Sequence, residues 1–229
     1  MEMKHILILA NSVKRHARCV AGREVFEDGR HAGWIRPIGT GEEHALLFAE
    51  QAYEDQTSPQ LLDIVAVPLA EAQPLVYQPE NWLIDVTRRW TRVAQASFEY
   101  AERLVENPPV LFLNGGSSGG GLNDEIPAER GHEVAASLCL IDVANMTVEV
   151  ERNRWTGGLD VRGRFSHNRM TYLLKITDPR THDEFLARGE GEYPLGRCLV
   201  CVSLTGPMLK RSDGRYYHYK LIAGIVRPA

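Results

Sequence analysis

Long apolar runs are missing from this sequence, and so are the marks of an exported chain. No apolar run in its 229 residues approaches the roughly 18–20 residues that cross a membrane. The early run Ile6–Leu9 is shorter than the core of a signal peptide, and no small-residue cleavage pattern follows it. We therefore expect a cytoplasmic protein without a membrane partner, whose first strand includes this run.

Cysteine is scarce as well. The four cysteines are scattered, which is typical of reduced thiols rather than of a disulfide framework. Cys198 and Cys201 form a C-x-x-C, but they lie in an apolar stretch that predicts a strand, where they would point to opposite faces. No second C-x-x-C or close histidine pair offers further zinc ligands. We interpret both as core cysteines, with a metal or redox site as the alternative.

Helical patterns are few. The best covers Arg92–Glu106, where apolar residues recur about every 3.6 positions, and shorter helices are expected at Glu42–Glu50 and Asp183–Arg188. Turn residues separate the remaining apolar segments, which predicts strands. The predicted strands are Lys4–Asn11, Arg18–Val25, Gly33–Ile38, Leu62–Leu69, Trp82–Val86, Ser137–Val143, Thr147–Arg152, Leu159–Ser166, Met170–Thr177, Arg197–Leu204 and His218–Val226. Five or six strands in each half indicate a mainly β protein of two small barrels or sandwiches, and disfavour a doubly wound α/β fold.

Catalytic signatures are also absent. The sequence has no G-x-S-x-G, and its eight histidines never form H-E-x-x-H or another tight pair. Asp178 precedes a proline at a strand end, so we interpret it as a turn residue rather than a catalytic acid. A metal-dependent nuclease remains an alternative, because Asp160 and Glu149 or Glu151 could meet across strands near Lys175. We expect no cofactor and no metal, and favour a binding protein over an enzyme.

A glycine-rich segment divides the two halves. Residues 114–121 read NGGSSGGG, with five glycines in eight residues. A phosphate-binding P-loop would continue with Gly-Lys-Ser/Thr, whereas an acidic stretch follows here. The segment therefore predicts a flexible linker. We expect a first barrel with a helical insertion at residues 1–113, a linker at 114–133 and a second barrel at 134–229.

Arginine and aromatic residues are interleaved in three patches, as in proteins that pair phosphates and stack bases. The alternatives are solvated arginines and a core Trp155 at residues 152–175, an ordinary exposed hairpin at residues 210–220, and an Arg36 buried against a carboxylate in the N-terminal patch. Positive charge also concentrates at the chain's two ends, with seven Lys/Arg against four Asp/Glu in residues 1–40. The candidate nucleic-acid-binding residues are Lys14, Arg15, Arg18, Trp34, Arg36, Arg154, Trp155, Arg162, Arg164, Lys210, Arg211 and Arg215.

Several short motifs of the chain resemble, in order, those of the dual OB-fold domain family. They are HILILAN with S-x-K, RCVAG, GWIRP, VRGRF, YLLKITDP, CVSL and YKLIA, beginning at His5, Arg18, Gly33, Val161, Tyr172, Cys201 and Tyr219. The resemblance spans nearly the whole chain. It implies two tandem OB-type barrels, and a role in sensing nucleic acid within prokaryotic defence or conflict systems, with any effector being a separate protein. It carries over no catalytic residues.

Three functions follow as hypotheses. The first is a module that binds single-stranded nucleic acid, either ssDNA or RNA, or senses a nucleotide. The second is a protein-interaction or scaffolding subunit, for which the acidic middle segment 41–106 would be a candidate surface. The third is the nucleic-acid-processing enzyme described above. OB barrels also bind saccharides, proteins and small ligands, so the fold by itself does not choose among these functions.

Overall fold

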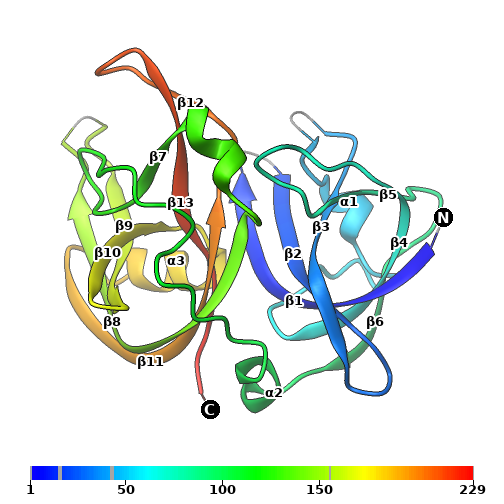
Figure 1. The fold of residues 1–229 in the computed structure, drawn as a ribbon. Coiled ribbons are helices and arrows are strands. Elements are labelled where there is room, and N and C mark those ends of the chain that lie inside the picture. Colours follow the sequence, from blue (N-terminus) through cyan, green and yellow to red (C-terminus); the bar gives the residue numbers. More distant parts are fainter. Residues whose placement is uncertain (1, 15–16, 42–43, 155, 229) are drawn as a thin grey trace. The chain divides into compact units, whose positions relative to one another are not determined.

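The computed structural model describes residues 2–14, 17–41, 44–154 and 156–228. The chain forms two compact units, Met1–Arg103 and Leu104–Ala229, each built mainly of strands (Figure 1). The expected mainly β class with a few short helices is confirmed. None of the helices in the described part is long and apolar enough to cross a membrane.

The strands of the first unit close on themselves. Its elements are β1 (Glu2–Lys14), β2 (Ala17–Val25), β3 (His31–Ile38), α1 (Phe48–Gln51), β4 (Asp63–Ala72), β5 (Asn81–Ile84), β6 (Thr91–Gln95) and α2 (Phe98–Glu102). The sheet runs β1-β2-β3-β5-β4, and β4 pairs again with β1. β3 and β5 are parallel, while the other pairs are antiparallel. This closed five-stranded path, with a helix between its third and fourth strands, is an OB-type barrel.

The second unit repeats this arrangement. Its elements are β7 (Glu125–Pro127), the 3₁₀ helix η2 (Ala128–Glu133), β8 (Leu138–Arg152), β9 (Leu159–His167), β10 (Met170–Ile176), α3 (Pro179–Leu186), β11 (Gly191–Leu204), β12 (Met208–Lys210) and β13 (Arg215–Val226). The path is β10-β9-β8-β11-β13, and β13 closes it by a parallel pairing with β10. α3 again follows the third barrel strand. The two tandem OB-like barrels that the sequence predicts are therefore present.

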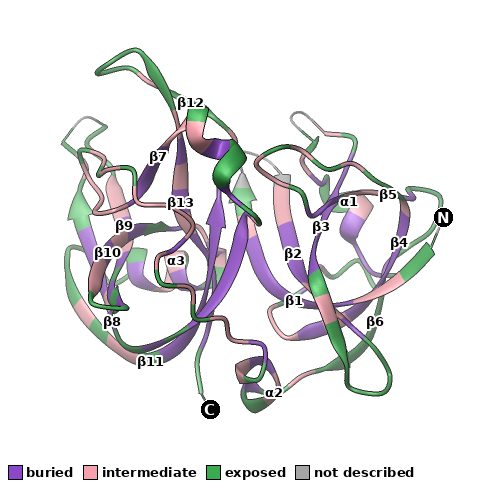
Figure 2. Ribbon diagram, in the orientation of Figure 1, coloured by how far each residue is buried: buried purple, intermediate pink, exposed green. Residues whose placement is uncertain are grey.

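Each barrel has its own apolar interior (Figure 2). In β9 the residues Val161, Gly163, Phe165 and His167 are buried, and Arg162, Arg164 and Ser166 between them face outward. This alternation places every second residue in the core, as a two-residue strand period requires. Cys198 and Cys201 are both buried free thiols, in agreement with their interpretation as core residues.

The glycine-rich segment is hydrogen-bonded into the second unit. The main chains of Leu122 and Leu173 in β10 bond to each other in both directions at 3.1 Å. The carbonyl of Asp124 accepts a bond of 2.8 Å from the main-chain N–H of Lys220 in β13. Residues 122–124, directly after the glycine-rich segment, are therefore bonded to both β10 and β13. The boundary between the compact units falls after Arg103, earlier than the expected end of the first barrel at residue 113.

The predicted helix Arg92–Glu106 is wrong over much of its length. Residues 91–95 form the exposed strand β6, which pairs with β4, and the helix is confined to Phe98–Glu102. Ser97 begins this helix by accepting a hydrogen bond from the N–H of Tyr100. Pairing with the exposed edge of β4 therefore overrides a local apolar spacing that is compatible with a helix.

Candidate nucleic-acid interface

An OB barrel binds its ligands on the face of its second and third strands and on the loops after its first and fourth strands. In the first unit these are β2, β3, the β1–β2 turn and the β4–β5 connection. In the second unit they are β9, β10, the β8–β9 turn and the β12–β13 hairpin. The predicted site residues belong to these elements, so their exposure and partners decide which of them could meet a ligand.

Trp34 and Arg36 on β3 are buried, with exposures of 8% and 4%. The Arg36 side chain donates from Nε to Glu80 Oε1 at 3.3 Å and from Nη1 to Cys19 Sγ at 2.9 Å. Glu80 is itself 7% exposed, so the two charges form a buried ion pair. This geometry favours the alternative of a structural arginine over a phosphate contact, because the guanidinium is already enclosed with an acid.

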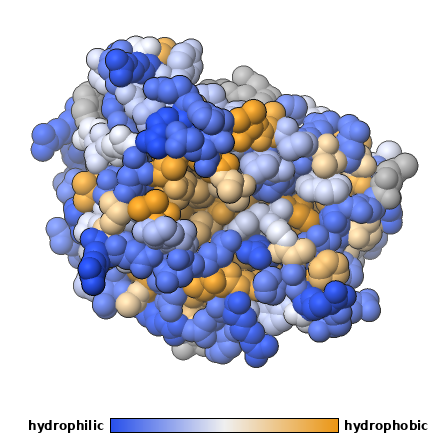
Figure 3. Space-filling model, in the orientation of Figure 1, coloured by the Kyte–Doolittle hydropathy of each residue, from blue (hydrophilic) through white to orange (hydrophobic). Residues whose placement is uncertain are grey.

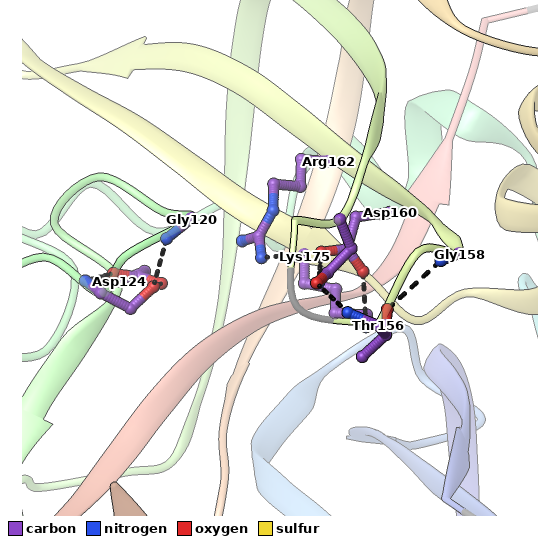
Figure 4. A network of polar contacts seen from close by, with 9 residues as sticks. Gly120, Asp124, Thr156, Gly158, Asp160, Arg162 and Lys175 are labelled. Atoms are coloured by element: carbon purple, nitrogen blue, oxygen red, sulfur yellow. Dashed lines mark hydrogen bonds and ion pairs between the residues drawn. The ribbon is translucent and has the colours of Figure 1, made fainter. Parts of the chain in front are cut away.

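Arg162 faces outward from β9 into a network of polar contacts (Figure 4). Asp160 accepts from Arg162 Nη2 at 3.4 Å, from Lys175 Nζ at 3.1 Å and from Asn153 Nδ2 at 2.7 Å. Partial burial alone would raise the pKa of Asp160, but the bonds from Asn153 and Lys175 and the nearby positive charges lower it. Asp160 therefore stays ionised and offsets cationic charge on this face.

The glycine-rich segment also approaches this network. A Cβ added to Gly120 would lie 2.9 Å from Arg162 Nη2, so the segment rests directly on the guanidinium. Asp124 accepts from the N–H of Ser118 at 2.7 Å and from its hydroxyl at 2.6 Å, which holds the segment's turn together. Arg162 thus lies between an acid and a stretch of main chain (Figure 4).

Arg164 on the same face is paired with Glu149 of β8 through two hydrogen bonds, one of them 3.1 Å from Nη2 to Oε2. The Glu149 side chain is 6% exposed, while that of Arg164 is 46% exposed. The negative charges of Glu192 and Glu151, like that of Glu149, raise the pKa of Arg164. The exposed end of Arg164 therefore lies among acids, which disfavours an incoming phosphate.

The β12–β13 hairpin presents a different surface. Arg211 and Arg215 are exposed and form no ion pair with any residue in the described part of the chain. Lys210, by contrast, is bonded to both carboxylate oxygens of Glu125 at 2.7 and 2.9 Å. Tyr216 lies beside the two arginines with 54% of its surface exposed. The hairpin extends away from its own barrel, and its tip is mainly hydrophilic (Figures 1 and 3).

The other predicted residues lie in the turns of the barrels. Arg18 is the second residue of β2, and Arg154 is exposed in the β8–β9 turn. Lys14 ends β1, where its main chain pairs with Ala17. Arg15 and Trp155 lie outside the described residues. The predicted set is therefore divided into the buried pair Trp34 and Arg36, cations in ion pairs, and a smaller group that forms no ion pair with the described residues.

Some exposed residues of these elements escaped the sequence analysis. Met208 and Leu209 lie on the hairpin with 53% exposure each, and Phe48 on α1 has 51% exposure. Their apolar character predicts burial, and only the position of the hairpin and of α1 on the barrels leaves them outside. Lys220 was missed for the opposite reason, since a lysine 1% exposed has no signature in the sequence.

Comparison with known families agrees with this geometry. A family model described as a dual OB-containing domain matches residues 4–225. The chain belongs to this family. Searches of curated proteins and of solved structures found no match. The two closed barrels are thus the two OB parts of a dual OB-containing domain, a fold class that binds nucleic acid among other ligands.

The carboxylates proposed for an enzymatic alternative have other partners in this dual OB-containing domain. Asp178 begins α3, where its Oδ1 accepts from the N–H of Arg180 at 3.2 Å and its Oδ2 from the hydroxyl of Thr181 at 2.9 Å. This is the turn role expected from Asp-Pro. Within the described ranges, no group of three or more His, Cys, Asp or Glu side chains is placed to hold a metal ion.

Proposed function

We propose that this chain binds single-stranded nucleic acid through the β12–β13 hairpin of its second barrel. The observation that carries the proposal is the pair Arg211 and Arg215, two exposed guanidiniums that form no ion pair with the described residues, beside the exposed ring of Tyr216. The carboxylate of Asp213 in the same turn accepts from the N–H of Arg215 and from the hydroxyl of Tyr217. Phosphates pair with guanidiniums and bases stack on aromatic rings, so this combination suits a single strand of either DNA or RNA.

The position of the hairpin supports the same proposal. It connects the fourth and fifth strands of its barrel, β11 and β13, and loops at this position of OB folds contact oligonucleotides. Leu209 pairs with Tyr216 across the hairpin, and Lys210 pairs with Arg215. Neighbouring pairs lie on opposite faces, so one face offers the ring and the other offers a cation.

The proposal extends to a nucleic-acid or nucleotide sensor in a prokaryotic defence system, with a separate effector protein as a partner. The family resemblance supports this wider role. Exposed Met208 and Leu209 suit a protein contact as well, so a scaffolding function is an outcome that the experiment must separate from nucleic-acid binding.

The test is fluorescence anisotropy with labelled single-stranded DNA and RNA at several salt concentrations. The double variant Arg211→Gln/Arg215→Gln is expected to weaken binding by roughly tenfold or more and to reduce the salt slope by roughly 1.4, because two phosphate contacts are lost. Tyr216→Leu is expected to weaken binding by roughly tenfold with the slope unchanged.

Arg197→Gln is the matched control, since this exposed arginine of the same unit is bonded to Asp142 at 2.7 Å. It is expected to bind like the parent chain. Salt-independent binding, no binding to any oligonucleotide, or equal losses in the control and in the double variant would each refute the proposal. Retention of a protein partner that depends on Met208 and Leu209, with no oligonucleotide binding, would favour scaffolding instead.

A further inference from the structure

Arg18 of the first barrel differs from the other arginines on its sheet. It is the second residue of β2, opposite Val13 of β1, and its main chain bonds in both directions with Leu46, at 3.0 and 3.2 Å. This bridge brings α1 against β2, so the Arg18 guanidinium lies over the Phe48 ring at 5.4 Å from the ring centre. The backbone therefore fixes a cation and an exposed ring side by side.

Two nitrogens of the Arg18 guanidinium have no hydrogen-bond acceptor. Its Nε and Nη1 are shielded from solvent and have no hydrogen-bond partner. On the same sheet Arg36 is paired with Glu80, and Arg23 donates from Nε to the carbonyl of Ala32 at 2.8 Å. A shielded donor without an acceptor costs free energy, which the guanidinium would recover by turning outward to bind an oxyanion.

Among the described residues, the surroundings of Arg18 are largely apolar and offer its guanidinium no unoccupied carboxylate. Val13, Leu47 and Phe48 are exposed by 44%, 45% and 51%. The carboxylate of Glu50 on α1 is occupied, because it accepts from the N–H and hydroxyl of Thr40 and from the N–H of Leu47. The ligand chemistry that complements this surface is an oxyanion joined to a flat, partly apolar group.

We propose that Arg18 and Phe48 form a nucleotide site on the first barrel, in which the guanidinium takes a phosphate and the base stacks on the ring and guanidinium. The proposal rests on the proposed function and adds a second contact for the same nucleic acid, on different residues from the hairpin. A peptide carrying a carboxylate would supply the oxyanion but lacks the stacking base, so the nucleotide is the better complement.

The first barrel contains a matched control. Arg30 also lies over an exposed phenylalanine, Phe26, at 5.5 Å. It differs from Arg18 in having an acid partner, Asp28, whose Oδ2 accepts from Arg30 Nε at 2.6 Å. If a ring and a cation were sufficient, both pairs would bind a nucleotide. If binding also requires a guanidinium without an ion pair, only the pair Arg18 and Phe48 will bind one.

The experiment titrates the full chain with a thymidine oligonucleotide and, separately, with inorganic phosphate. Anisotropy reports oligonucleotide affinity, and the Nε–H resonance of Arg18 reports contact at the guanidinium. Arg18→Gln and Phe48→Leu are each expected to weaken oligonucleotide binding by about five- to tenfold. Arg18→Lys is expected to keep the salt dependence of oligonucleotide binding. Arg30→Gln is expected to have an oligonucleotide affinity within about twofold of that of the parent chain. Thermal melting checks that each variant is folded.

Each outcome decides the proposal. Movement of the Arg18 resonance on adding oligonucleotide, together with both losses of affinity, supports it. Oligonucleotide binding that is lost in Arg211→Gln/Arg215→Gln but unchanged in Arg18→Gln overturns it and leaves the proposed function standing. Equal resonance shifts with inorganic phosphate, and no effect of Phe48→Leu, also overturn it, because the site would then hold an anion without recognising a base.

Discussion

Lys220 carries the sharpest prediction about stability. Its side chain is 1% exposed, and its Nζ donates to Asn114 Oδ1 at 3.4 Å and lies 5.2 Å from the centre of the Tyr172 ring. Burial lowers the pKa of Lys220 to about 8, and the charge of Asp124 only partly opposes this. The folded chain therefore binds a proton at this amine less readily than the unfolded chain does.

The size and the sign of the effect follow from that pKa. The ordinary pKa of a lysine is 10.5, and each pKa unit corresponds to 1.36 kcal/mol, so the buried amine lowers the free energy of unfolding by about 3 kcal/mol at pH 7. The cost is complete below pH 8, shrinks as the pH rises from 8 to 10.5, and vanishes above that. Lys220→Met removes the amine but also its contact with the ring, so a net gain of about 2 kcal/mol is expected at pH 7.

Urea denaturation at pH 7 and at pH 10.5 measures this difference. Lys220→Met is expected to raise the free energy of unfolding at pH 7, and this increase should disappear or reverse at pH 10.5. Lys175→Met is the control, because this exposed lysine of the same barrel should change stability by less than about 0.5 kcal/mol at pH 7. A Lys220→Met chain that is less stable at pH 7, or whose gain does not depend on pH, would refute the reasoning.

Two further predictions concern the first barrel. Glu80→Gln leaves the charge of Arg36 buried without its acid and is expected to lower the free energy of unfolding by about 3 kcal/mol in urea denaturation, while Arg36→Met/Glu80→Leu should recover most of this loss. Gly22→Ala is expected to cost roughly 1–3 kcal/mol in the same assay, because its Cβ would lie 1.9 Å from a carbonyl of β1. A Cβ at Gly33 would meet no atom within 4 Å, so Gly33→Ala should change the free energy of unfolding by less than about 1 kcal/mol. Equal effects of the two alanine substitutions would contradict the steric argument.

Much of the barrel architecture is predictable from the sequence because strand periodicity is local. The prediction Leu159–Ser166 matches β9 almost residue for residue, since apolar residues alternate there with charged ones. Ser137–Val143 and Thr147–Arg152 were expected as two strands and form one long strand, β8. Asn145 interrupts the apolar pattern between them, but pairing with β11 and β9 carries the strand through.

The candidate site was only partly predictable. The sequence identifies Arg211 and Arg215 as cations beside aromatic residues, and the structure leaves them exposed on a hairpin. It identifies Arg36 and Arg164 by the same pattern, although both are bonded to buried acids. Periodicity places such a side chain on one face of a strand, but it does not say what lies across from that face.

The sequence by itself determined the strands, the turns and the supply of arginines and rings, because these follow from neighbouring residues. Only the tertiary structure decided which arginines are neutralised, because the partners lie far along the chain. Arg36 and Glu80 are 44 residues apart, and Lys210 and Glu125 are 85 apart. Each pair meets through the pairing register of a closed barrel, and that register also leaves the guanidiniums of Arg18, Arg211 and Arg215 without an ion pair in the described part of the chain.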